Sequence, residues 1–154
     1  MTKETILEQL HAARAGHIGW VQRAKLLVSG FDVKEDAIPL DSTGCKFGQW
    51  FYSDGQKLRT LLTGSTDTWG KIEEYHIQIH DIYLNIFKIF YGTGKKGFFS
   101  KLLGGKKKVN DSDRETAQKY LDEIRRVSRL LIHEIEQLEK EVLSIDEARI
   151  AALK

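Results

Sequence analysis

The chain has only one cysteine and one proline in 154 residues, and it contains no apolar stretch long enough to span a bilayer. A lone cysteine cannot form an internal disulfide, which indicates a reducing compartment, so we expect a cytoplasmic protein. The N-terminal residues are charged and amphipathic and lack the apolar core of a secretory signal. Because proline interrupts helices, its scarcity permits long helices along almost the whole sequence.

Length and composition predict a single folded domain over residues 1–154. With 41% hydrophobic and 30% charged residues, the chain has the composition of an ordinary globular protein. Its formal net charge is +2, but residues 95–108 carry six lysines and no acid. The rest of the chain therefore has 18 basic residues against 22 acidic ones, and the basic character is confined to one segment.

The hydrophobic pattern predicts an all-α protein, because apolar residues recur at steps of three and four and strand-like alternation is missing. The first helix ends at Ser29-Gly30, and its apolar seam includes a histidine: Ile6, Leu10, Ala13, His17, Trp20, Ala24 and Leu27. A short helix carrying Cys45 follows, and its candidate N-caps are Asp41, Ser42 and Thr43. The next helix reaches about Phe90 and has three candidate N-caps: Ser65, Thr66 and Asp67.

The longest helix is expected over residues 112–152, opened by a capping box of Ser112 and Glu115. Its heptad pattern is Leu121, Ile124, Ser128, Leu131, Ile135, Leu138, Val142 and Ile145. The predicted fold is an antiparallel four-helix bundle with an additional short helix that carries the cysteine and a long C-terminal helix. We expect the far end of that last helix to extend past the bundle and pair with a second chain, giving a homodimer.

A glycine-rich basic loop is predicted over residues 92–110. Its lysines are Lys95, Lys96, Lys101, Lys106, Lys107 and Lys108. Two interpretations stay open. In the first interpretation, the lysines and the neighbouring apolar residues dock weakly on anionic lipid or on nucleic acid. In the second, the loop is solvated and binds neither.

Four side chains form a candidate zinc site: His17, Cys45, His76 and His80. His76 and His80 are one helical turn apart, so both rings point to the same side, and the other two residues come from separate segments. Two imidazoles from one helix, a third from another and one thiolate complete a tetrahedral ligand set for Zn²⁺. Each residue alone is more often a buried structural residue, but their joint occurrence favours the metal. His11 and His133 are not grouped with other candidate ligands and are predicted not to bind the metal.

The words HIGW (17–20), CKFGQW (45–50) and HIQIH (76–80) resemble the pattern of the chemoreceptor zinc-binding (CZB) domain family. The resemblance covers roughly residues 10–90. It implies that His17, Cys45, His76 and His80 are the zinc ligands and that Trp20, Gly48 and Trp50 are packing residues of the motif. Family members often have an acidic residue before the first histidine, where this chain has Gly16, so another acceptor must orient the His17 ring.

The resemblance further implies a bacterial sensor that responds to zinc or to oxidation of the zinc-bound thiolate and signals to a partner of the chemoreceptor or diguanylate cyclase type. No small-molecule substrate is expected. Two alternatives remain. In the first alternative, the zinc ion only holds together a dimerisation or docking module. In the second, the chain is a zinc hydrolase in which the fourth coordination position of the zinc is open. The motif words contain no carboxylate to act as a general base, which disfavours the enzyme.

Overall fold

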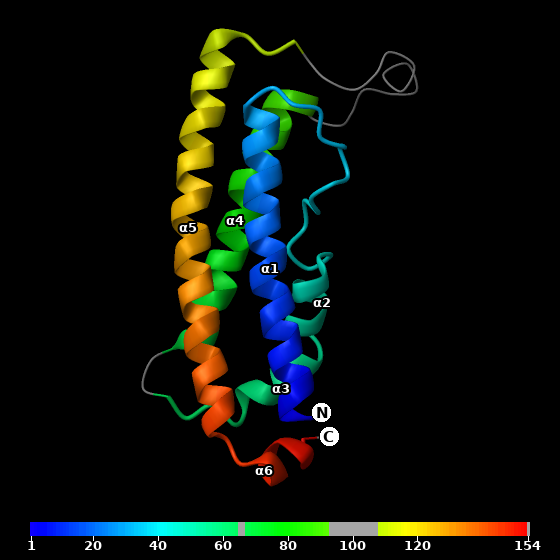
Figure 1. The fold of residues 1–154 in the computed structure, drawn as a ribbon, viewed down its shortest axis with the longest axis vertical. Helices are drawn as coiled ribbons and strands as arrows, with labels where there is room; N and C mark the ends of the chain where they lie inside the picture. Colours follow the sequence, from blue (N-terminus) through cyan, green and yellow to red (C-terminus); the bar gives the residue numbers. More distant parts are fainter. Residues whose placement is uncertain (65–66, 93–107, 154) are drawn as a thin grey trace.

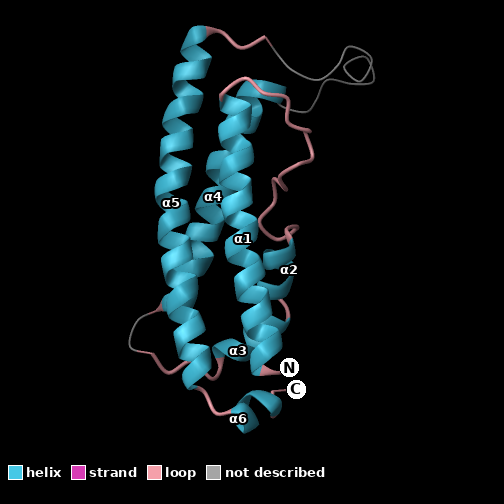
Figure 2. Cartoon of the chain, viewed as in Figure 1, coloured by secondary structure: helices cyan, strands magenta, loops and turns pink. Residues whose placement is uncertain are grey.

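The computed structural model describes residues 1–64, 67–92 and 108–153. Within these ranges the chain forms helices and no strand (Figure 2). The helices are α1 (Lys3–Val28), α2 (Lys46–Phe51), α3 (Asp54–Arg59), α4 (Thr68–Tyr91), α5 (Asp111–Ser144) and α6 (Glu147–Ala151). The all-α prediction is therefore confirmed.

Three long helices, α1, α4 and α5, lie side by side along the long axis of the molecule (Figure 1). Helices α1 and α4 run in the same direction, and α5 runs opposite to both. Residues 29–64, which we call the return segment, make this possible because they bring the chain back along α1 through α2 and α3. The expected count of four long antiparallel helices is not confirmed: the described residues contain three, and two of them are parallel.

The core lies between the three long helices and follows the predicted apolar seams. Every heptad position predicted in the last helix is buried, from Leu121 to Ile145. The seam of α1 is buried as well, except that Trp20 is partly exposed. Ion pairs flank these contacts and join α5 to its neighbours: Arg14 Nη1 is 2.9 Å from Glu136 Oε1, and Lys71 Nζ is 3.3 Å from Glu134 Oε1.

Both ends of the last long helix differ from the prediction. Its N-cap is Asn110, whose side-chain oxygen accepts a hydrogen bond from the backbone N–H of Asp113 at 2.7 Å. The capping box of Ser112 and Glu115 is therefore wrong, because Ser112 already lies inside the helix. The helix ends at Ser144, and Ile145 has extended backbone angles, so a single helix to residue 152 is also wrong.

After this break, α6 folds back beneath the bundle instead of extending past it (Figure 1). The backbone N–H of Lys3 donates to Glu147 Oε1 at 3.1 Å, and its Nζ donates to the Leu143 carbonyl at 3.2 Å. Ile150 is fully buried. The C-terminal end is thus tied to the start of α1, and the expected overhang for pairing with a second chain is not formed by the described residues.

Five of the six lysines in the predicted basic loop lie outside the described residues; Lys108 is described and exposed. The membrane or nucleic-acid contact of this loop therefore stays a prediction. Among the helices that the structure describes, none combines the length and the apolar character that a bilayer crossing requires.

Candidate metal centre

His17 lies on the buried seam of α1, and its side chain is almost completely buried. Its Nδ1 is 2.7 Å from the carbonyl oxygen of Ala13. A carbonyl only accepts hydrogen bonds, so this contact assigns the proton to Nδ1 and leaves the lone pair on Nε2. That Nε2 is buried and has no hydrogen-bond partner. The Ala13 carbonyl thus orients the ring in the absence of an acid at Gly16.

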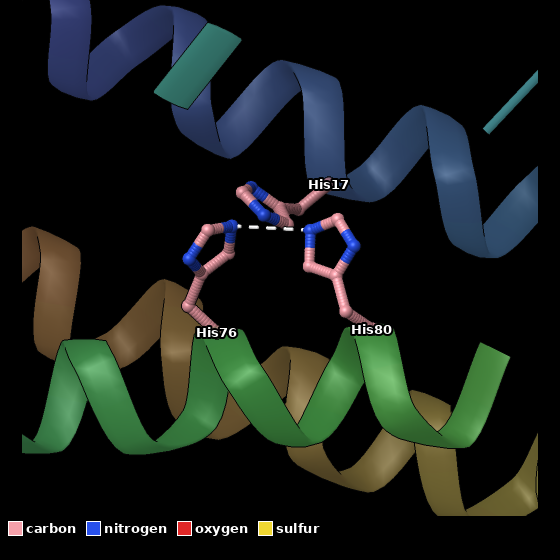
Figure 3. Close-up of side chains that lie close together, drawn as sticks. All are labelled: His17, His76 and His80. Carbon is pink, nitrogen blue, oxygen red and sulfur yellow. Dashed lines mark hydrogen bonds between the residues drawn. The ribbon is translucent and has the colours of Figure 1, made fainter. Parts of the chain in front are cut away.

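Helix α4 supplies His76 and His80. It begins at the predicted cap Asp67, whose Oδ1 accepts the N–H of Gly70 at 2.9 Å. Both rings are buried and point away from α4 toward His17, and their Nε2 atoms are 3.2 Å apart (Figure 3). The three histidines offer ligand nitrogens that lie within 4.8 Å of one another. The structure therefore brings together three of the four predicted ligands from two helices.

Cys45 lies at the same centre, with its Sγ 3.3 Å from Nε2 of His76 and the residue 1% exposed. It is itself the N-cap of α2, because its sulfur accepts the backbone N–H of Gly48 at 3.2 Å. The predicted caps Asp41, Ser42 and Thr43 are therefore wrong. Asp41 instead closes the preceding turn by accepting the N–H of Thr43 at 3.0 Å. The hydrogen bond from Gly48 favours the thiolate form of the cysteine.

Two of the separations at the centre fit one tetrahedral zinc ion, whereas the ligand nitrogens of the three histidines lie up to 4.8 Å apart and the Cys45 sulfur lies outside that three-histidine group. Zn–N bonds of about 2.0–2.1 Å place two ligand nitrogens about 3.3 Å apart, and a Zn–S bond of about 2.3 Å places sulfur and nitrogen about 3.5 Å apart. The observed distances of 3.2 Å and 3.3 Å are close to these tetrahedral edges. A cation between the four side chains would also satisfy the buried, unpartnered Nε2 of His17. The residues present therefore fit the metal.

Burial controls the charge of the three imidazoles. Loss of solvation lowers the pKa of His17 to about 4 and that of His76 to about 3, and neighbouring histidines lower both further. Burial also lowers the pKa of His80. All three rings are therefore neutral at pH 7, which is the form that binds metal. Burial raises the pKa of Cys45 in the metal-free protein, so the thiolate needs a positive charge beside it.

Aromatic rings enclose the centre. The Trp20 ring centroid lies 4.7 Å from that of His17 and 5.0 Å from that of His80. Phe47 covers the other side, 5.1 Å from His76 and 5.7 Å from His17. Trp50, expected to be a packing residue of the motif, contacts the rings of Phe47 and Trp69 instead of the histidine rings. Sequence reasoning assigned no role at the metal to Phe47, although its place two residues after Cys45 was a usable signal.

The remaining histidines lie away from the centre. The His11 side chain is 59% exposed and its Nε2 is 3.7 Å from a carboxylate oxygen of Glu139 on α5. His133 is exposed on α5. Neither belongs to the group of side chains that could hold a metal ion among the described residues.

A helical fold with a buried cluster of histidines and a cysteine defines a zinc-binding domain as the class of protein. Residues 17–86 match the family model of the chemoreceptor zinc-binding domain, CZB. The resemblance inferred from the three sequence words is thereby confirmed, and zinc is the metal that such domains bind. Neither a curated protein nor a solved structure gives a significant match to the chain.

The buried histidines predict a pH-dependent stability for the metal-stripped protein. Their folded-state pKa values lie below the ordinary value of 6.5, so the unfolded chain takes up protons first as the pH falls. The free energy of unfolding should therefore be highest above pH 6.5 and fall steadily toward pH 4. Urea denaturation of chelator-treated protein at pH 7.5, 6 and 5 measures this slope.

One variant tests the assignment of that slope to buried rings: His17→Gln should reduce the slope. An unfolding free energy that stays constant between pH 7.5 and 5 would contradict the burial-based account.

Proposed function

We propose that the chain is a zinc-dependent regulatory domain of bacterial signalling in which His17, Cys45, His76 and His80 hold one zinc ion. The observation that carries the proposal is the group of three buried histidines, whose ligand nitrogens lie within 4.8 Å of one another, with the buried Cys45 sulfur 3.3 Å from Nε2 of His76. The set closes the coordination sphere and leaves no position for a substrate. A regulatory role is therefore favoured over hydrolysis.

The ligands link parts of the chain that are far apart in sequence. His17 belongs to α1, His76 and His80 belong to α4, and Cys45 belongs to the return segment. A bound zinc ion supplies positive charge that stabilises the thiolate and joins the three parts. Because the return segment contacts the histidine rings through Phe47 and Cys45, Cys45 is the ligand whose loss would loosen this segment at the centre.

Cys45 is also the chemically reactive ligand. Its thiolate attacks the chlorine of hypochlorous acid, giving a sulfenyl chloride and hydroxide; water then displaces chloride, leaving a sulfenic acid and a proton. The sulfur has lost two electrons and its negative charge, so it is a poorer ligand. We propose that this change, or a change in zinc supply, is transmitted as movement of the return segment to a signalling partner of the chemoreceptor or diguanylate cyclase type.

The same proposal places the domain in the cytoplasm as a homodimer. A reducing compartment keeps the lone thiol free of disulfides. Two copies of the chain form a symmetrical dimer that contacts the signalling partner. Size-exclusion chromatography with light scattering measures the mass of the species directly.

One equivalent of hypochlorous acid should release zinc from the loaded protein. A chromogenic zinc chelator reports the release, and mass spectrometry locates the added oxygen. We expect the oxygen on Cys45, the only cysteine of the chain, and recovery of zinc binding after treatment with dithiothreitol.

The control separates the thiol from the other oxidisable sulfur, the one methionine, Met1. Chloramine treatment of protein whose thiol is reversibly blocked as a mixed disulfide oxidises Met1 alone, and zinc should rebind fully after unblocking. Zinc that stays bound while Cys45 is oxidised would refute the redox response.

A static zinc staple is the second candidate, and the burial of all four side chains favours it. His17, Cys45, His76 and His80 are each 3% exposed or less. Isotope exchange distinguishes the two roles: a sensor exchanges bound zinc with free zinc within minutes, whereas a staple retains it for many hours.

A further inference from the structure

Tyr83 carries a buried hydroxyl without a hydrogen-bond partner. The residue is 1% exposed and lies on α4, three residues after His80 and therefore on the same face of the helix. Burial raises the pKa of Tyr83, so the hydroxyl stays neutral and can both donate and accept. An unpaired buried hydroxyl destabilises a fold, and a phenylalanine would fill the same space without that cost.

A second unpartnered polar atom is Nδ1 of His80, and His80 and Tyr83 line the same pocket. In Figure 3 this nitrogen points away from His76, on the opposite side of the ring from the Nε2 that faces the metal centre. This pocket has no room for a water molecule. Its lining is otherwise apolar or indole: Trp20, Ile38, Ile79, His80, Tyr83 and Ile124. A bridging water is therefore excluded, and only a direct contact can pair the two groups.

Metal binding creates the need for such a contact. When Nε2 of a histidine binds a metal, Nδ1 carries the proton and requires an acceptor that fixes the ring. His17 has this acceptor in the Ala13 carbonyl. Nδ1 of His80 makes no hydrogen bond of full geometry; burial lowers the pKa of this ring, and weak hydrogen bonds with the backbone carbonyls of Pro39 and Leu40 raise it.

The geometry points to Tyr83 as a positioning residue for the metal centre: its hydroxyl accepts the Nδ1–H of His80 when Nε2 of His80 binds the ion. This inference rests on the proposed ligand set. The pairing joins two side chains that lie three residues apart on α4 and line one pocket. It satisfies both orphaned groups at once and holds the His80 ring in its metal-binding orientation.

The variant Tyr83→Phe tests the inference because it separates stability from zinc affinity. Without metal, the variant should melt at the same temperature as the parent or higher, since it loses only an unpaired hydroxyl. With metal, its zinc affinity, measured by competition with a chelator, should fall about tenfold. The absorption bands of the cobalt-substituted variant should also shift, because the ligand field changes when the His80 ring is free to turn.

Tyr91→Phe is the matched control. It removes a hydroxyl from the same helix, but this hydroxyl donates to the Val33 carbonyl, away from the metal centre. We expect it to lower the melting temperature of the metal-free protein and to leave the cobalt spectrum unchanged.

Three results have distinct meanings. Unchanged zinc affinity and unchanged cobalt bands in Tyr83→Phe would overturn the inference and leave the Pro39 or Leu40 carbonyl as the acceptor. A lower melting temperature of metal-free Tyr83→Phe would also overturn it, since the hydroxyl would then have a structural partner. Full zinc content in His80→Ala would instead refute the ligand set itself, and so the proposed function, whatever Tyr83→Phe does.

Discussion

Replacing His76 by alanine should reduce the zinc content from one ion per chain to a small fraction of that. His76 is the most central of the four side chains: its Nε2 is 3.3 Å from the Cys45 sulfur and 3.2 Å from Nε2 of His80. Its loss therefore opens the middle of the ligand set. Metal analysis of protein purified without chelator or nickel resin measures the content, and Cys45→Ser should behave alike.

The same variant should lose the stability that zinc contributes. A ligand present at about a thousand times its Kd stabilises a folded protein by about 4 kcal/mol, which raises the melting temperature of a domain of this size by roughly 10 °C. We expect that difference between zinc-loaded and metal-stripped parent protein. In His76→Ala the two preparations should melt together.

His11→Ala is the control for this experiment, because His11 lies on α1 like His17 but its side chain is 59% exposed. It should keep one zinc ion and the full thermal difference. One zinc ion per chain in both His76→Ala and Cys45→Ser would contradict the proposed centre.

Replacing Gly48 by alanine should both unfold the return segment and weaken zinc binding. A Cβ on Gly48 would lie 1.8 Å from the carbonyl oxygen of Ser42, 2.9 Å from its carbonyl carbon and 3.2 Å from Cα of Thr43. All three are backbone atoms, so no side-chain rotation relieves the overlap. The turn before Cys45 must move, and the hydrogen bond from the Gly48 N–H to the cysteine sulfur must break.

The expected cost is at the upper end of single substitutions, about 4 kcal/mol or more in unfolding free energy. Urea denaturation of the zinc-loaded and metal-stripped variant measures it, and chelator competition measures zinc affinity. Because the clash repositions Cys45, the zinc-loaded form should lose more stability than the metal-free form.

Gly19→Ala is the matched control, because Gly19 is a glycine within HIGW as Gly48 is within CKFGQW. Gly19 lies inside α1, between His17 and Trp20, and a Cβ there would have no atom within 4 Å. Alanine favours a helix over glycine by about 1 kcal/mol, so this variant should be slightly more stable and bind zinc normally. A Gly48→Ala protein that melts and binds zinc like the parent would contradict this prediction, because the backbone at Ser42 would then have moved to accommodate the Cβ without loss of stability.

Much of the fold was predictable because it depends on local pattern. The seams of α1 and α5 were predicted residue by residue, since burying an apolar stripe at a spacing of three and four is what makes a helix pack. Helix ends were less predictable. Asn110 and Cys45 serve as caps where Ser112 and the residues 41–43 were expected, because several neighbouring polar side chains can each end a helix and tertiary contacts choose among them.

The direction of α4 was not predictable from periodicity. A helix with the same apolar face packs either way, and only the length and path of the return segment make α4 parallel to α1. The break after Ser144 was missed for a similar reason. The heptad pattern continues through Ile145, but contacts of Lys3 with Glu147 and Leu143 and the burial of Ile150 turn the chain back.

The sequence by itself determined the helical class, the apolar seams and the choice and order of the side chains that suit zinc, because residue type and helical spacing are local properties. The tertiary structure decided how these side chains meet. It gave Cys45 the capping role, put Phe47 against the rings, and set the tautomer of His17 through Ala13. These features depend on contacts between segments that are distant in the chain, and such contacts exist only after the helices have packed.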